Sequence, residues 1–389
     1  MDVHPRAASY PMAPCILHVG MPKTGTSSIQ DSLFHGLSDP RFRYVSLGHV
    51  NSAIFLATLF GSQPETFWLF RRSRRSPDEI DRMRRGFAAR LRRVLRTAAA
   101  RGQTPIISAE YCWQLTEAEL ARLSNFFTTE GFVVRIIAYI RPIRSWLESH
   151  FQQSVKIGGH AFDPTLAACP AETRPYHYAG KLAAFERVFG RENLTVRPFI
   201  RAGLAGGCVV RDFCGTLGVT LDPRAVIRSN DALSGEAVRL LYAYNRFRSP
   251  AAVRSVNQRF LLLKRMEEVT GDPLRFHAAA VAPMTGEIAA QERVVRDRYG
   301  LDIAADTIVA DGADRVRTEA DLFRYSAATL EWLASASGAA AIGRSGGEAT
   351  ARQIAAAMER LRQRPAARTR LALLASRARN GLRWMRHGD

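Results

Sequence analysis

The chain has 389 residues, 47% of them hydrophobic, and carries 55 basic against 36 acidic side chains, a net charge of +19. This composition excludes a disordered chain and leaves one large domain or two. The high pI favours a polyanion, a nucleotide or an acidic membrane surface as partner. Five cysteines without a CxxC pair, and no apolar run near 18 residues, predict a reduced, metal-free, cytoplasmic protein.

The first informative stretch runs from Cys15 to Leu33. Its apolar start, Cys15 to Val19, predicts a buried strand, and Gly20 to Pro22 end it. A lysine and hydroxyl residues follow, and Ile29 and Leu33 have the spacing of a helix face. The first amides of a helix have no partner inside it and point outward, so this strand, turn and helix predict an anion site.

The clearest long helix spans residues 76–100, with Ser76 as its cap and Pro77 at its first position. Residues 71–101 hold twelve arginines against three acids. These arginines form either a solvated helix face or a docking surface for an acidic acceptor. Strands are predicted at 41–46, 103–111, 133–140 and 193–199, and further helices at 51–60, 116–127, 178–189, 209–217 and 234–247. This alternation predicts an α/β fold with a central parallel sheet flanked by helices.

The spacing of glycines and lysine in the first stretch separates it from a kinase loop. Gly20 and Gly25 keep the GxxxxGK spacing, but Thr26 stands where the lysine of a kinase would be, and Lys23 lies inside the loop. PKTGTS resembles the phosphosulfate-binding loop of sulfotransferases that use 3′-phosphoadenosine 5′-phosphosulfate (PAPS). The resemblance implies a three-layer, P-loop-like fold in which PAPS is bound by Lys23, Thr24, Gly25, Thr26, Ser27 and Ser28.

A second motif lies at residues 139–158, where a predicted strand ends at Arg141 and a helix begins near Pro142. An arginine and a serine eight residues apart, here Arg141 and Ser149, resemble the pair that holds the 3′-phosphate of PAPS in sulfotransferases. The segment is similar to the bacterial, carbohydrate-type branch, but it has Arg-Pro in place of the commoner RDP. Arginine offers planar bidentate donors to phosphate, which agrees with this role.

The resemblance implies transfer of a sulfuryl group to a hydroxyl or amine of a carbohydrate or glycolipid. Lys23 would act in catalysis, Glu110 is the first choice for the general base, and His150 is the second. No metal is required. The alternative is a P-loop nucleotide or small-molecule kinase, against which the missing lysine at position 26 counts. A nucleic-acid binder is disfavoured because no basic stripe alternates with aromatic residues.

Five regions are expected along the chain: a loose lead-in (1–14), a PAPS-binding core (15–235), a helical acceptor-side extension (236–333), a flexible linker (334–349) and a basic amphipathic tail (350–389). The tail has an apolar helical face surrounded by arginines. It either docks on the protein's own core or lies on an anionic membrane surface, where the acceptor would be a lipid-linked glycan.

Overall fold

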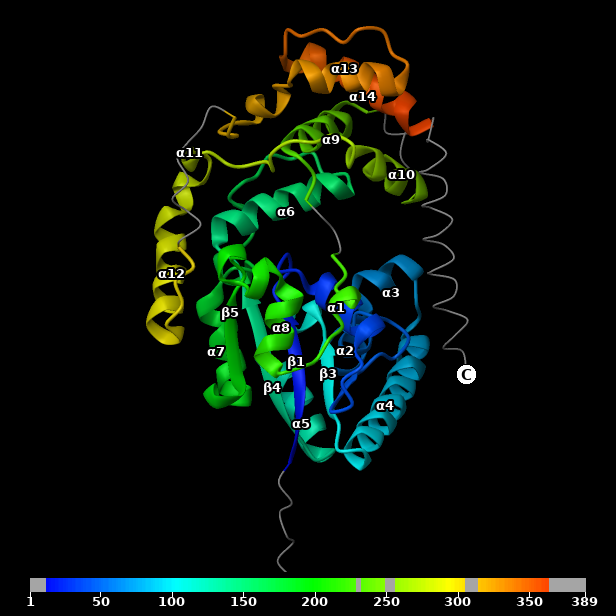
Figure 1. Cartoon of the computed structure of the whole chain (residues 1–389), viewed down its shortest axis with the longest axis vertical. Helices are drawn as coiled ribbons and strands as arrows, with labels where there is room; N and C mark the ends of the chain where they lie inside the picture. Colours follow the sequence, from blue (N-terminus) through cyan, green and yellow to red (C-terminus); the bar gives the residue numbers. More distant parts are fainter. Residues whose placement is uncertain (1–11, 229–231, 249–255, 305–313, 364–389) are drawn as a thin grey trace, which may run out of the picture. The chain divides into compact units, whose positions relative to one another are not determined.

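The structure is a computed structural model, and it describes residues 12–228, 232–248, 256–304 and 314–363. The chain divides into two compact units (Figure 1). Among the described residues, the sheet unit comprises 12–141, 177–228 and 294–301, and the helical unit comprises 142–176, 232–248, 256–293, 302–304 and 314–363. This division differs from the regions expected from the sequence, because residues 142–176 leave the sheet unit in the middle of the expected core.

A five-stranded parallel sheet forms the centre of the sheet unit, with the strand order β2-β3-β1-β4-β5. The strands are β1 (Ala13–Gly20), β2 (Phe42–Tyr44), β3 (Thr104–Ser108), β4 (Phe132–Ile140) and β5 (Leu194–Pro198). From β1 the chain goes to one edge of the sheet, and from the neighbouring β4 it goes to the other. In open α/β sheets such a reversal creates a crevice at the carboxyl ends of the strands.

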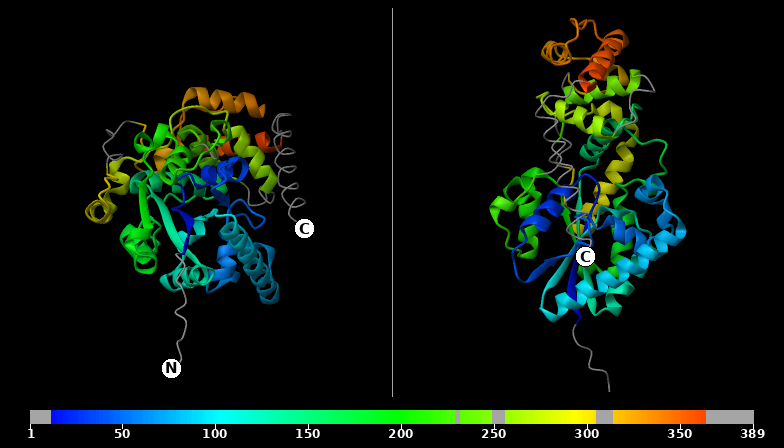
Figure 2. Two further views of the ribbon diagram at one scale, coloured as in Figure 1. Left: turned by 60° about the horizontal axis from the view of Figure 1, so that its bottom comes forward. Right: turned by 90° about the vertical axis from the view of Figure 1, so that its right-hand side faces the viewer.

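Helices cover both faces of this sheet (Figure 2). On one face, α1 (Thr26–Gly36) and α8 (Val209–Leu217) enclose a core with the β1, β3 and β4 side chains Ile16, Ile106 and Ile137. Right-handed crossovers place the helices that lead into β3, β4 and β5 on the other face. These are α4 (Pro77–Ala100), α5 (Glu117–Thr129) and α7 (Tyr178–Phe189), and α2 (Ala53–Phe60) and α3 (Trp68–Ser73) precede α4.

The predicted α/β fold with a parallel central sheet is confirmed. Local signals explain most element ends in the sheet unit. Ser76 and Thr116 each accept a hydrogen bond from the backbone amide three residues on, and the glutamate there bonds back to the cap residue. These two capping boxes fix the starts of α4 and α5. The predicted bounds of α7 and α8 agree with the structure to the residue.

The helical unit contains α6 (Ile143–Ile157), α9 (Gly235–Phe247), α10 (Val256–Met266), α11 (Ala278–Val281), α13 (Ala327–Ser337) and α14 (Gly347–Gln363). α12 (Thr285–Tyr299) begins in this unit and ends in the sheet unit. α9 packs between α6 and α14. The ring of Phe151 on α6 lies 6.0 Å from that of Tyr242 on α9 and 5.6 Å from that of Phe276, measured between centroids.

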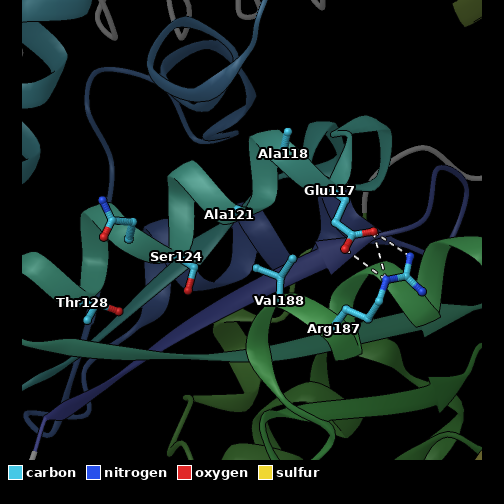
Figure 3. A pocket seen from close by; sticks show the side chains of 8 residues that line it. Glu117, Ala118, Ala121, Ser124, Thr128, Arg187 and Val188 are labelled. Carbon is cyan, nitrogen blue, oxygen red and sulfur yellow. Dashed lines mark hydrogen bonds and ion pairs between the residues drawn. The ribbon is translucent and has the colours of Figure 1, made fainter.

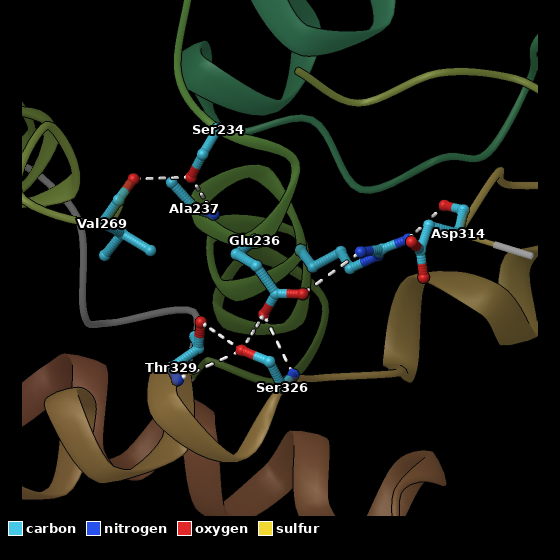
Figure 4. Close-up of polar contacts among 8 residues, drawn as sticks. Ser234, Glu236, Ala237, Val269, Asp314, Ser326 and Thr329 are labelled. Carbon is cyan, nitrogen blue, oxygen red and sulfur yellow. Dashed lines mark hydrogen bonds and ion pairs between the residues drawn. The ribbon is translucent and has the colours of Figure 1, made fainter. Parts of the chain in front are cut away.

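Ser234 and Glu236 organise the start of α9 (Figure 4). The Ser234 hydroxyl accepts a 3.1 Å hydrogen bond from the Ala237 amide and donates one of 2.6 Å to the Val269 carbonyl. The Glu236 carboxylate accepts from the Ser326 amide at 3.2 Å. Ser234 is therefore a helix cap that also ties down a neighbouring segment, which is a structural role.

The expected linker, 334–349, contains the end of α13 and the start of α14. Between these helices the Gly343 amide donates a 2.8 Å hydrogen bond to the Gln353 side chain, and Ile342 is buried. The arginine-rich part of the expected tail, residues 364–389, lies outside the described residues. Within the described residues, every helix is too short or too polar to cross a bilayer.

Candidate active site

The loop after β1 has an unusual backbone. Lys23 has φ 74° and Gly25 has φ 77°, so both lie in the left-handed region. This conformation is rare for a lysine and costs free energy, so the surrounding structure must hold it. The Thr24 side chain is fully buried, and its hydroxyl donates a 2.6 Å hydrogen bond to the Met21 carbonyl. A Cβ at Gly25 would lie 2.8 Å from Cγ1 of Val209, so this position also needs glycine for space.

The N-terminus of α1 differs from those of α4 and α5 because no side chain caps it. Gly25 is the N-cap residue and has no side chain that could accept a hydrogen bond from the first turn. The Thr26 hydroxyl oxygen is buried at the first residue of α1 and lies within reach of the Glu110 carboxylate. A Cβ at Gly20 would lie 1.9 Å from that oxygen. The helix start and Thr26 together offer donors for an anion.

Arg141 follows the last residue of β4 and reaches back over this loop. Its Nη1 donates a 2.9 Å hydrogen bond to the carbonyl of Lys23. Its guanidinium carbon lies 5.6 Å from the centroid of the Phe199 ring, which follows β5. The Tyr178 hydroxyl donates to the Arg141 carbonyl and also contacts the Met21 sulfur at 3.3 Å. Arg141 is therefore fixed by residues from three further segments of the sheet unit.

Glu110 lies two residues beyond the end of β3, in the short 3-10 helix Glu110–Gln114. The prediction that it ends the strand is wrong, because Ser108 closes the pairing with β1. Burial raises the pKa of Glu110, and the opposing effects of the Lys23 ammonium and the Thr26 hydroxyl are smaller. The carboxyl group therefore lies close to the anion loop and has a raised affinity for protons, as a general base requires.

A buried polar network supports the end of β3. The Ser108 hydroxyl lies 2.8 Å from His18 Nδ1 and 3.2 Å from the side-chain nitrogen of Gln30. Burial lowers the pKa of His18 to about 3, so this imidazole stays neutral. The Ala109 amide also donates to the His18 carbonyl at 3.1 Å. These contacts join β1, α1 and β3 just before Glu110, and they fix the backbone that carries it.

The structure brings most of the predicted site residues together in the sheet unit. Loop residues 23–28 follow β1, Glu110 follows β3 and Arg141 follows β4, all at the carboxyl ends of neighbouring strands. Ser149 lies on α6 in the helical unit, so its pairing with Arg141 stays a prediction. His150 is also on α6, where its ring stacks on Trp146 with centroids 4.9 Å apart.

Two residues that hold Arg141 were missed at the sequence level, Tyr178 and Phe199. Both lie in segments whose helix and strand were predicted, but neither position has a local signal of function. Tyr178 is the first residue of α7, and Phe199 is the first residue after β5. The one sequence signal for Phe199 is its position, because it is an aromatic residue at the carboxyl end of a predicted parallel strand.

Another carboxylate of the sheet unit, Asp212 on α8, is buried and fully paired. It accepts hydrogen bonds from the Tyr139 hydroxyl at 2.6 Å and from Arg197 Nε and Nη2 at 3.1 and 2.5 Å. The Ala205 amide adds a fourth at 3.3 Å. Burial works to raise the pKa of Asp212, but the bonds from Arg197, Tyr139 and Ala205 outweigh it and lower the pKa.

A depression between α5 and α7 is lined by side chains that offer little chemistry (Figure 3). It contains an ion pair in which Arg187 Nη2 lies 2.7 Å from Oε2 of Glu117, with both side chains about half exposed, and Ser124, Asn125 and Thr128 also line it. The remaining lining residues include Ala118, Ala121 and Val188. Over the residues that the structure describes, no three histidine, cysteine or carboxylate side chains gather as metal ligands would.

Comparison with known proteins adds little to this geometry. No protein-family model matches the sequence, and no curated protein matches it. The chain is similar to the solved structure of a sulfotransferase from Alicyclobacillus acidocaldarius, with a TM-score of 0.35 and 18% sequence identity over 60% of this chain and 92% of that one. A similarity this loose carries no argument about a reaction, so the case for a function rests on the side chains of the site.

Proposed function

We propose that the protein is a PAPS-dependent sulfotransferase that transfers a sulfuryl group to a hydroxyl or amine of a carbohydrate or glycolipid. The observation that carries the proposal is the left-handed loop at Lys23, with Arg141 bonded to the Lys23 carbonyl and Glu110 close to the Lys23 charge. A cation, an uncapped helix start and a proton acceptor at one edge of a parallel sheet suit transfer of an anionic group.

The residues present fit a phosphosulfate. α1 begins without a side-chain cap, and the Thr26 hydroxyl lies at its first residue. Both features suit the oxygens of an anion. Arg141 suits the 3′-phosphate, which the predicted pairing with Ser149 would complete. Lys23 lies nearer the chemistry than Arg141, since its charge acts on Glu110.

When bound, PAPS supplies a sulfuryl group whose bond to the 5′-phosphate oxygen breaks as the acceptor oxygen or nitrogen bonds to sulfur. Glu110 takes the proton of the attacking hydroxyl or amine. Lys23 and the first-turn amides of α1 stabilise the negative charge that grows on the phosphate oxygen. The Arg141 hydrogen bond keeps the Lys23 backbone in its left-handed conformation, so that the ammonium group stays where this charge develops.

The proposal is tested by ligand-induced stabilisation of the full chain. Adenosine 3′,5′-bisphosphate (PAP), the product of the reaction, should raise the melting temperature without magnesium, because a ligand that binds the folded state stabilises it. Stabilisation by ATP with magnesium and not by PAP would point instead to a kinase, and stabilisation by oligonucleotides alone would point to a nucleic-acid binder. Transfer of ³⁵S from labelled PAPS to carbohydrate acceptors would then establish the reaction.

A further inference from the structure

The short helix α3 presents an exposed tryptophan beside two arginines. Trp68 is 62% exposed, and Arg71 and Arg72 are exposed as well. Residues three and four positions apart lie next to each other on a helix, so Arg71 and Arg72 lie on the same side of α3 as Trp68. We call Trp68, Arg71 and Arg72 the Trp68 patch.

The patch carries positive charge that the protein does not neutralise. Residues 65–85 hold seven arginines and four acids. Two of these acids are engaged, since Glu79 pairs with Arg75 and Asp81 pairs with Arg84, each at 2.8 Å. The side chains of Arg71 and Arg72 form no ion pair or hydrogen bond with the residues that the structure describes. They are therefore available to an anionic ligand.

Aromatic contacts connect the patch to the candidate base. The Trp68 ring lies 5.9 Å from the Phe67 ring, and the Phe67 ring lies edge-on to Tyr111 with centroids 5.4 Å apart. Tyr111 directly follows Glu110. A Cβ at Gly61 would lie 3.1 Å from the Tyr111 hydroxyl, so α2 ends tightly against this ring. Phe67, the residue before α3, thus joins the start of α3 to the 3-10 helix that carries Glu110, within the sheet unit.

We propose that the Trp68 patch binds the acceptor, and that this acceptor is an acidic saccharide. The indole offers a flat apolar face to the C–H face of a sugar ring. The guanidinium groups offer bidentate hydrogen bonds to carboxylate or sulfate groups on that ring or the next. The proposal rests on the proposed sulfotransferase function, and it names the substrate class of that same site.

An anionic membrane is the competing partner for such a patch, and the composition of the surface disfavours it. Membrane-docking surfaces insert several apolar side chains. Among the described residues, the large hydrophobic side chains that stand out as exposed are Met12, Trp68 and Ile157. Met12 directly precedes β1, at the opposite end of that strand from the anion loop, and Ile157 belongs to the helical unit. Trp68 is therefore a single anchor, which suits one sugar ring.

The test measures saccharide binding by the full chain without nucleotide, using tetragalacturonate, a chondroitin sulfate tetrasaccharide and neutral maltotetraose. We expect binding of one or both acidic probes and not of maltotetraose. Trp68→Ala and the double variant Arg71→Gln/Arg72→Gln should each raise the dissociation constant about tenfold or more. Trp68→Phe should recover most of the lost affinity. The melting temperature should not change, because all three side chains are exposed.

The matched control is Arg90→Gln/Arg93→Gln on α4, which removes the same charge from exposed arginines away from the patch. This variant should weaken binding less than twofold. Equal weakening by both double variants, or no binding of either acidic probe by the native chain, would overturn the proposal. The proposal would also be overturned if flotation of the protein with phosphatidylglycerol vesicles required Trp68 while saccharide binding did not require it. PAP binding is measured separately. Failure of PAP to bind would contradict the proposed function, whereas failure of the acidic saccharides alone would contradict only the role of the Trp68 patch.

Discussion

Two carboxylates of the sheet unit, the buried Asp212 and the partly buried Glu110, have opposite environments. Asp212 accepts four hydrogen bonds from Tyr139, Arg197 and the Ala205 amide, and its pKa is lowered. Glu110 is near one ammonium and one hydroxyl, and burial raises its pKa. Both lie in the same α/β unit.

The difference separates a carboxylate that stabilises the fold from one that we propose acts as the general base. Asp212 joins β4, β5 and α8 and has its ionised form fully satisfied, so it stabilises the fold and has no reason to take up a proton. Glu110 is desolvated without enough donors, so its proton affinity is raised at the edge of the sheet where ligands bind.

Replacing Glu110 with glutamine should reduce turnover about 10²–10⁴-fold, the range for loss of a general base. Nucleotide binding and thermal stability should change little, because glutamine keeps the size of the side chain and removes a carboxylate that burial disfavours. Steady-state sulfuryl transfer and PAP titration provide the two readouts. An active glutamine variant would move the role of base to His150.

Replacing Lys23 with alanine should reduce turnover about 10²–10³-fold, as expected for loss of a donor that acts mainly in the transition state. PAP affinity should fall less. The same change should raise the pKa of Glu110 further, because the lysine charge that opposes the effect of burial is removed. Turnover that stays within a few-fold of the native rate would show that this loop does not bind the reacting group.

Replacing Asp212 with asparagine should lower the free energy of unfolding by about 3 kcal/mol, near the lower end for breaking a buried pair, because 37% of the Arg197 side chain stays exposed. Chemical denaturation measures this loss. Turnover of the folded fraction should stay near the native value. A catalytic defect without a loss of stability would contradict the structural role of Asp212.

Replacing Arg141 with alanine should weaken PAP binding by about 1.5–3 kcal/mol, the range for hydrogen bonds to charged groups. Binding of adenosine 5′-phosphosulfate, which lacks the 3′-phosphate, should weaken less, through the lost bond to the Lys23 carbonyl alone. Calorimetric titration of both ligands provides the comparison. Equal weakening of the two would remove Arg141 from the 3′-phosphate site.

The pH dependence of stability should differ in sign for the two carboxylates. Folding lowers the pKa of Asp212, so its ionised form stabilises the folded state at a pH above the ordinary carboxyl pKa. This contribution to the free energy of unfolding is lost as the pH falls through the pKa of Asp212 in the folded state. The pKa of Glu110 is raised, so the folded state holds that proton more tightly, and stability declines as the pH rises through the folded pKa. Denaturation of Asp212→Asn and Glu110→Gln across pH should each remove the corresponding slope and leave the other.

Much of the fold could be predicted because its signals are local. Ser76 and Thr116 cap α4 and α5 through residues three positions away, and the apolar run of β4 has the length of a buried strand. The position of Glu110 was missed by two residues because the end of β3 is set by pairing with β1, which the sequence of β3 does not contain. The division into two units was missed for the same reason, since it depends on contacts between distant segments.

The sequence by itself determined the anion loop, because Gly20, Lys23 and Gly25 stand within six residues and glycine alone fits where a Cβ would collide with Thr26 or Val209. Only the tertiary structure decided what surrounds it. Tyr178 and Phe199 hold Arg141 over the loop, and the desolvation of Glu110 distinguishes it from Asp212. The physical reason is that backbone conformation follows from neighbours in the chain, whereas burial and proton affinity follow from neighbours in space.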